Sequence, residues 1–123
     1  MEALIPGLFS LPKAERLSGR TAVSDLFSKG NWGGYGALRY CFRKGNGQDV
    51  NRIMVSVPKK FFRRAVKRNL LKRRIRESYR RQKSLVPSSA GIDIAFLYNT
   101  KDLLDYRTIY ETVGTILKKL GDE

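Results

Sequence analysis

The 123-residue sequence contains no histidine and only one cysteine, Cys41. Without histidine the chain cannot assemble a Ser-His-Asp triad or a Cys-His pair, so both classes of nucleophilic enzyme are excluded. A single thiol cannot close an intramolecular disulfide, and without imidazoles it cannot supply the usual zinc-ligand sets. These absences argue against a hydrolase whose chemistry is carried by protein side chains.

Acidic residues are also scarce, since 11 Asp and Glu stand against 25 Lys and Arg and leave a formal net charge of +14. The carboxylates form no D-x-D pattern or cluster typical of a metal site, and we predict none in the protein. Asp102 and Asp105 are interpreted as helix caps or first-turn acids. Self-repulsion at this charge destabilises a compact monomer, so the excess favours a polyanionic partner.

Long apolar runs are missing too, and none approaches the roughly 20 residues of a membrane-spanning helix. The first seven residues carry no basic region and contain Pro6 and Gly7, which makes them a poor signal peptide. We therefore expect no membrane association and a cytoplasmic location. The 41% hydrophobic content suffices for one small core. A single domain over residues 1–123 is predicted, with about residues 1–15 as an extended, loosely attached segment.

Local patterns predict an α+β fold, a single-domain α-β sandwich in which helices pack on a small central sheet. The apolar strand at residues 92–98 is expected to lie in the centre of that sheet. Residues 31–34 are predicted as a loop, and residues 44–49 as a turn that joins the first two strands in a hairpin. The predicted helices span residues 21–29, 63–83 and 103–120, and the predicted strands span residues 36–43, 52–57 and 92–98.

Positive charge is concentrated in residues 59–83, which hold thirteen basic side chains and one acid, Glu77. On a helix, five of these cations and Asn69 fall within an arc of about 140°. An apolar column beside that arc, formed by Leu71, Ile75 and Tyr79, would let the helix dock with its cations outward. Most charged runs are merely solvated surfaces, but those usually mix Glu with Lys. The near absence of acids here favours a polyanion-binding surface.

The abundance of arginine favours RNA over DNA, because a planar guanidinium suits both phosphate and stacked bases. A membrane-surface helix would need a broad apolar face, and a helix-turn-helix would need a helix directly before this one. Neither feature is present. Composition alone leaves a DNA-binding module open.

The segment VSVPKKFFRRAVKRNLLKRRIRESYR, residues 55–80, closely resembles the bacterial ribonuclease P protein family. The family pattern is a strand ending in V-S-x-K-K, followed by A-V-x-R-N-x-x-K-R-x-x-R-E on a helix. Leu70 departs from the R-N-R core of that pattern, and Arg74 stands where an apolar residue is common. Pro58 replaces a serine, and one extra residue lies between Lys60 and Ala65. Residues 9–13, 16–17, 26–27 and 30 are also similar to the family's opening.

The resemblance implies an unusual left-handed β-α-β crossover and one strand more than the local patterns show. It implies a protein subunit that helps a catalytic RNA remove the 5′ leader from precursor tRNA, with Mg²⁺ bound mainly by that RNA. It implies no need for a protein partner. The alternatives are a ribosomal or RNA-chaperone protein, a DNA-binding module and a stand-alone nuclease.

Site residues follow from the resemblance and from the helical projection. The residues expected to contact the catalytic RNA are Lys59, Lys60, Arg64, Arg68, Asn69, Lys72, Arg73, Arg76 and Arg80. The residues expected to hold the single-stranded leader are Val23, Phe27, Leu38 and Tyr40. For these four, filling the core is an equally good interpretation. Phe61 and Phe62 could stack on bases or pack under the basic turn, and Trp32 has no assigned role.

Overall fold

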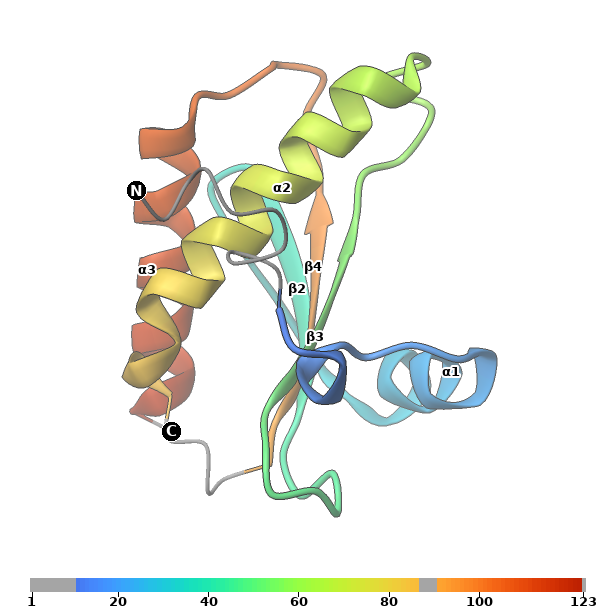
Figure 1. Ribbon diagram of the computed structural model, residues 1–123, viewed down its shortest axis with the longest axis vertical. Helices are drawn as coiled ribbons and strands as arrows, with labels where there is room; N and C mark the ends of the chain where they lie inside the picture. Colours follow the sequence, from blue (N-terminus) through green and yellow to red (C-terminus); the bar gives the residue numbers. More distant parts are fainter. Residues whose placement is uncertain (1–10, 87–90, 123) are drawn as a thin grey trace.

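The computed structural model describes residues 11–86 and 91–122. In this part of the chain one four-stranded sheet, with the order β1-β2-β4-β3, is combined with three α-helices (Figure 1). The β3–β4 pair is parallel and the other pairs are antiparallel. The elements are η2 (Lys13–Glu15), α1 (Arg20–Lys29), β1 (Asn31–Tyr35), β2 (Leu38–Arg43), β3 (Arg52–Ser56), α2 (Ala65–Gln82), η3 (Lys83–Leu85), β4 (Asp93–Tyr98) and α3 (Tyr106–Gly121).

Strand β4 lies in the interior of the sheet, as predicted from its apolar run. Ile94 and Phe96 face the larger core beneath α2 and α3, whereas Ala95 faces a smaller core beneath α1. All three side chains are fully buried. A strand covered on both faces needs apolar residues at consecutive positions, which accounts for the continuous apolar run.

The predicted hairpin between residues 36–43 and 52–57 is wrong, because β4 is inserted between β2 and β3. Residues 44–51 instead carry the chain to the far edge of the sheet. The true hairpin joins β1 to β2 through a turn that contains Gly36 at a positive φ of 57°. The predicted hairpin assumed that successive strands pair, whereas here β4 pairs through one edge with β2 and through the other with β3.

Residues 31–34, predicted as a loop, belong to β1, and β1 is the strand that the local patterns missed. Its glycines explain the error, because they resemble turn residues in a sequence. Gly33 is required by packing: a Cβ there would lie 2.6 Å from the Tyr40 ring. The smallest residue therefore admits the aromatic ring of the neighbouring strand.

The connection from β3 through α2 to β4 is left-handed, as the family resemblance implies. In Figure 1 the sheet is seen nearly edge-on, with β3 in front of β4 and with α2 and α3 on its left. Both strands run upward in this view, and the chain passes from the nearer strand β3 to the farther strand β4 through a helix on the left. This path is a left-handed crossover, whereas most β-α-β connections are right-handed. The short-range periodicity of the sequence carries no information on the handedness of the crossover.

The two faces of the sheet are covered unequally (Figure 1). Helices α2 and α3 cover one face, while Leu26 of α1 and Leu17, which precedes this helix, cover part of the other. Beside α1, Met54 and Leu97 are only partly buried and Arg39 is exposed. The sheet therefore keeps an open face next to α1.

The described part of the N-terminal segment predicted as extended and loosely attached contains the 3-10 turn η2 and a buried Leu11, while residues 12–14 are exposed. Leu11 and Leu17 are 3% and 5% exposed. The Leu17 amide donates to the Ile53 carbonyl at 2.8 Å, beside a parallel bridge between Arg16 and Ile53. Residues 1–10, and with them part of this prediction, lie outside the described residues.

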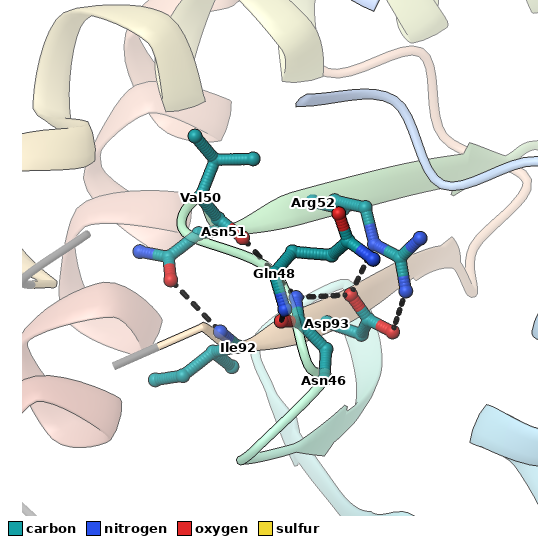
Figure 2. A network of polar contacts seen from close by, with 7 residues as sticks. All are labelled: Asn46, Gln48, Val50, Asn51, Arg52, Ile92 and Asp93. Atoms are coloured by element: carbon teal, nitrogen blue, oxygen red, sulfur yellow. Dashed lines mark hydrogen bonds and ion pairs between the residues drawn. The ribbon is translucent and has the colours of Figure 1, made fainter. Parts of the chain in front are cut away.

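A buried polar network fixes the start of β4 (Figure 2). The Asp93 carboxylate accepts hydrogen bonds from Arg52 Nε and Nη2 and from Asn46 Nδ2, each at 2.8 Å. Asn51 Oδ1 accepts the Ile92 amide at 2.8 Å, and Asn46 Oδ1 accepts the Gln48 amide at 2.7 Å. Since Arg52 and Asp93 are register partners, the network locks the parallel pairing of β3 with β4.

Candidate nucleic-acid interface

Helix α2 is docked through the apolar column predicted for it. Leu71, Ile75 and Tyr79 are at most 1% exposed and belong to the larger core. Because one side chain of this column packs inward at each helical turn, the opposite side of the helix faces solvent. That arc and the turn before it present the cations: Lys59, Lys60, Arg63, Arg64, Lys67, Arg73 and Arg76 are exposed, as is Asn69, and Lys72 is partly exposed.

These cations are not neutralised by carboxylates. Within residues 11–86 and 91–122 the salt bridges are Arg52–Asp93, Arg80–Glu77, Arg81–Glu77, Lys83–Glu15 and Arg107–Glu111, and none involves the exposed cations of the arc. The surface thus carries positive charge that an anionic partner can neutralise.

Arg80 differs from the other predicted contacts because Glu77 already pairs with it. Glu77 also accepts from Arg81 Nε at 2.9 Å. Burial raises the pKa of Glu77, but the hydrogen bonds from Arg80 and Arg81 outweigh burial and leave it below its ordinary value. The C-terminal end of α2 is therefore closer to charge balance than its N-terminal half.

Arg68 acts as a clamp within the protein. Its Nη1 donates to the carbonyl oxygens of Phe62 at 2.8 Å and Arg63 at 2.7 Å, just before α2 begins. These bonds hold the turn at residues 58–64, which carries Lys59 and Lys60. Arg68 was predicted as an RNA contact, and the geometry assigns its guanidinium a positioning role as well.

Replacing Arg68 by lysine keeps the charge but should remove this pair of hydrogen bonds, because the lysine side chain is one atom shorter and its ammonium would not reach both carbonyl oxygens. We expect RNA affinity to fall roughly tenfold, equivalent to about 1.4 kcal/mol, and tryptic cleavage within residues 59–64 to accelerate. Arg73→Lys, at an exposed position without such bonds, is the matched control. Unchanged affinity and proteolysis in Arg68→Lys would show that the turn does not depend on the clamp.

Arg16 joins the α2 surface from the N-terminal segment. Partial desolvation and the neighbouring Arg16 charge lower the pKa of Arg76. Arg16 is held in place by donation from its Nε to the Leu11 carbonyl at 2.9 Å. Two adjacent cations that repel each other form a position where an anion is stabilising. No local pattern indicates this pairing, because it depends on how the N-terminal segment packs against α2.

The predicted leader-binding residues separate onto opposite faces of the sheet. Leu38 and Tyr40 are 2% and 3% exposed in the core beneath α3, so the prediction that they hold single-stranded RNA is wrong. Alternation along β2 turns both toward the helical layer. Val23 and Phe27 remain half-buried on α1, beside the open face of the sheet. Phe62 is also buried, which supports its packing role.

Alanine substitutions should separate these two groups. Tyr40→Ala is expected to lower the free energy of unfolding by about 3–5 kcal/mol, as for other buried aromatic residues. Phe27→Ala should instead weaken binding of single-stranded RNA with no change in salt dependence, since no charge is removed. Urea unfolding and RNA titrations at several salt concentrations measure the two effects. A reversal of these outcomes would contradict the assignment of the rings.

In the part of the chain that the structure describes, no three His, Cys, Asp or Glu residues lie together so that they could hold a metal ion. No helix in that part is long and apolar enough to cross a membrane.

The chain is similar to known proteins over most of its length. The Ribonuclease P family model matches residues 11–121. The ribonuclease P protein component of Porphyromonas gingivalis is 39% identical, with 94% of this chain and 90% of the relative covered. That of Thermotoga maritima is 33% identical, with 90% and 96% covered.

Solved structures show the same fold. The RNase P protein from Thermotoga maritima has a TM-score of 0.74 at 34% identity, covering 85% of this chain and 96% of that one. The Staphylococcus aureus RNase P protein has a TM-score of 0.76 at 25% identity, covering 87% and 95%. By the match to the family model and by these relatives, the chain belongs to the ribonuclease P protein family.

Proposed function

We propose that this chain is the RNA-binding protein subunit of ribonuclease P and assists a catalytic RNA in removing the 5′ leader from precursor tRNA. The observation that carries the proposal is the exposed arc of α2 and its preceding turn, whose cations have no carboxylate partners in the described residues. Family membership supplies the RNA subunit as the partner.

The chemical step belongs to the RNA in this proposal. Bound Mg²⁺ would activate water and stabilise the leaving oxygen at the cleaved phosphodiester. The protein's Lys and Arg side chains neutralise phosphates of the folded RNA, which lowers the repulsion between RNA segments that must approach each other. The concentration of free cations needed for folding and cleavage should fall accordingly.

The leader is proposed to lie on the α1 side of the sheet. Val23 and Phe27 offer half-buried apolar surface there, and the sheet beside α1 is partly uncovered. Val23 and Phe27 line a shallow pocket on the exposed side of α1, and Arg20, Ser24 and Ser28 supply the polar groups of the same pocket. Unpaired bases can stack on such surfaces, whereas paired bases cannot reach them. No protein partner is invoked, and the cytoplasm, where RNA is transcribed and processed, is the proposed location.

Reconstitution tests the proposal. The chain is added to a bacterial catalytic RNA at low Mg²⁺, and cleavage of a precursor tRNA is followed. We expect cleavage to accelerate strongly over the RNA alone at low Mg²⁺ and only slightly at high Mg²⁺. Binding without acceleration would favour an RNA chaperone or ribosomal protein, and cleavage by the protein alone would favour a stand-alone nuclease. Preference for duplex DNA in competition would favour a DNA-binding module.

A further inference from the structure

A pocket lies where the N-terminal segment, the residues before β3 and the end of α2 meet. Its volume is about 470 Å³, within the roughly 300–1,000 Å³ of pockets that bind small molecules. Its polar and apolar walls come from all three segments: Glu15, Val50, Asn51, Tyr79, Lys83 and Ser84. Figure 2 shows the Val50 side chain pointing away from the Asp93 network. None of these residues was predicted to contact RNA.

The Tyr79 hydroxyl is a hydrogen-bond donor without an acceptor in the protein. Tyr79 is 1% exposed, and its ring packs 6.4 Å from the ring of Phe96. It lines the pocket, but its hydroxyl forms no hydrogen bond within residues 11–86 and 91–122. Burial and the charge of Glu15 raise the pKa of Tyr79, so the phenol stays protonated at neutral pH. Buried polar groups are nearly always paired, and an unpaired one that lines a pocket points to a ligand.

Glu15 and Lys83 contribute an ion pair to the same pocket. The Lys83 Nζ lies 3.0 Å from Oε1 and 3.3 Å from Oε2 of Glu15. A carboxylate has about four lone-pair positions, so each oxygen can accept a further hydrogen bond while the ammonium stays in place. Because the two charges cancel, the pocket attracts neither a free anion nor a free cation strongly. It suits a neutral ligand that offers two donors and one acceptor.

A nucleobase is a neutral ligand of this kind, and the positive charge of the chain concentrates nucleic acids and nucleotides near its surface. Val50 and the buried Val86 supply apolar walls for a flat ring. Guanine presents two adjacent donors, N1–H and N2–H, beside the acceptor O6. Adenine and cytosine place an acceptor nitrogen beside their amino group, and uracil has one donor between two acceptors. Those acceptors would be repelled by a carboxylate, so Glu15 selects guanine.

We propose that this pocket binds one guanine base, whose N1–H and N2–H donate to the Glu15 carboxylate and whose O6 accepts from the Tyr79 hydroxyl. Lys83 holds the carboxylate in position. This inference goes beyond the proposed function, because it applies both to an unpaired guanosine of an RNA and to a free guanine nucleotide. The simpler alternative, an ion pair above a hydrated tyrosine, provides no discrimination between bases.

Nucleosides test the site, because they carry no phosphate that could bind to the cations of α2. The full-length protein is dialysed to equilibrium with radiolabelled guanosine, and unlabelled inosine and adenosine are added as competitors. Inosine lacks the N2 amino group and so loses one hydrogen bond to the carboxylate, which should weaken its binding roughly 10- to 100-fold. Adenosine should not compete. Equal competition by the three nucleosides, or no saturable binding of guanosine, would overturn the proposal.

Variants separate recognition from packing. Tyr79→Phe removes only the hydroxyl and should raise the Kd for guanosine roughly 2- to 10-fold, while urea unfolding stays unchanged because no bond within the described chain is lost. Glu15→Gln should raise it roughly 10- to 100-fold. Glu111→Gln is the matched control, since it removes an equal charge from the exposed pair with Arg107. Lower stability of Tyr79→Phe with unchanged guanosine binding would leave Tyr79 a packing residue and refute the site.

The catalytic RNA identifies the source of the guanine. If saturating RNA displaces the labelled guanosine, and Glu15→Gln weakens RNA binding without changing its salt slope, an unpaired guanosine of that RNA occupies the pocket. If the guanosine stays bound in the complex, a free guanine nucleotide is the ligand. Failure of the unsubstituted chain to bind the catalytic RNA would contradict the proposed function, whereas the nucleoside competition would still decide the guanine site.

Discussion

Replacing Arg73 and Arg76 together by glutamine is expected to weaken binding of the catalytic RNA and to flatten its salt dependence by about 1.4–1.8 log units per log unit of salt. Both side chains are exposed on α2 and have no carboxylate partner in the described ranges. With about 1.5 kcal/mol for each charge-assisted contact, Kd should rise roughly a hundredfold. Equilibrium titrations at several salt concentrations give both quantities.

The fold should survive this change. Arg76 is already less favourable as a cation here, because desolvation and Arg16 lower its pKa. Neutralising it removes a repulsion, so the free energy of unfolding should stay equal or rise slightly. A loss of RNA affinity therefore cannot be ascribed to unfolding if circular dichroism and urea unfolding match those of the unsubstituted chain.

Lys118 and Lys119 supply the matched control. Both are exposed in the last turn of α3, and replacing them by glutamine removes the same two charges. We expect RNA affinity and the salt slope to change little. If the control weakened binding as much as the α2 variant, net charge alone would attract the RNA, and the assignment of the interface to α2 would be wrong.

The interface on α2 could be predicted because helical periodicity is a local property. Once residues 63–83 were assigned to a helix, the positions of the apolar residues fixed which cations remain outside. Leu71, Ile75 and Tyr79 are buried as expected, and Asp105 caps α3 by accepting the Thr108 amide at 2.9 Å. Each of these inferences needs only residues within about one or two helical turns.

The arrangement of the strands could not be predicted in this way. Alternation along a strand tells which residues share a face, but it does not tell which strand lies alongside. The position of β4 depends on contacts far apart in sequence, such as that between Arg52 and Asp93. The error for Leu38 and Tyr40 has the same cause, since their role depends on which face of the sheet α3 covers.

Side-chain contacts with the backbone were equally hidden. Arg68 resembles the other cations in the sequence, and only the turn at residues 58–64 reveals its carbonyl partners. Trp32 directly precedes Gly33 and Gly34 and resembled a loop residue, whereas the pairing of β1 with β2 and the hydrogen bond from its Nε1 to the Phe27 carbonyl place it on the sheet. In both cases the role is set by a neighbour that periodicity does not identify.

Replacing Asp93 by alanine is expected to lower the free energy of unfolding by about 3 kcal/mol, because it removes one partner of a largely buried ion pair. The Asp93 side chain is 9% exposed and Arg52 22% exposed. Without the carboxylate, the Arg52 guanidinium loses both of its Asp93 hydrogen bonds, and the Asn46 amide keeps only the Val50 carbonyl as an acceptor (Figure 2). Urea unfolding followed by circular dichroism measures the loss.

Three companion variants make this prediction specific to the network. Asp93→Asn keeps an acceptor oxygen and should lose less stability than Asp93→Ala. Arg52→Leu combined with Asp93→Ala should cost less than the sum of the single changes, because neither partner is then left unpaired. Asp49→Ala removes an equal charge from an exposed position in the loop that carries Asn46 and should change stability by less than about 0.5 kcal/mol.

The network also bears on RNA binding, because it sets the register of β3, the strand that leads into the basic turn and α2. In Asp93→Ala the affinity for RNA should fall only by the fraction of unfolded chain, and the salt slope of the folded fraction should be unchanged. A changed slope would mean that the register shift moves the cations themselves. Equal stability losses for Asp93→Ala and Asp49→Ala would show instead that general charge balance, and not the buried acceptor, holds β3 against β4.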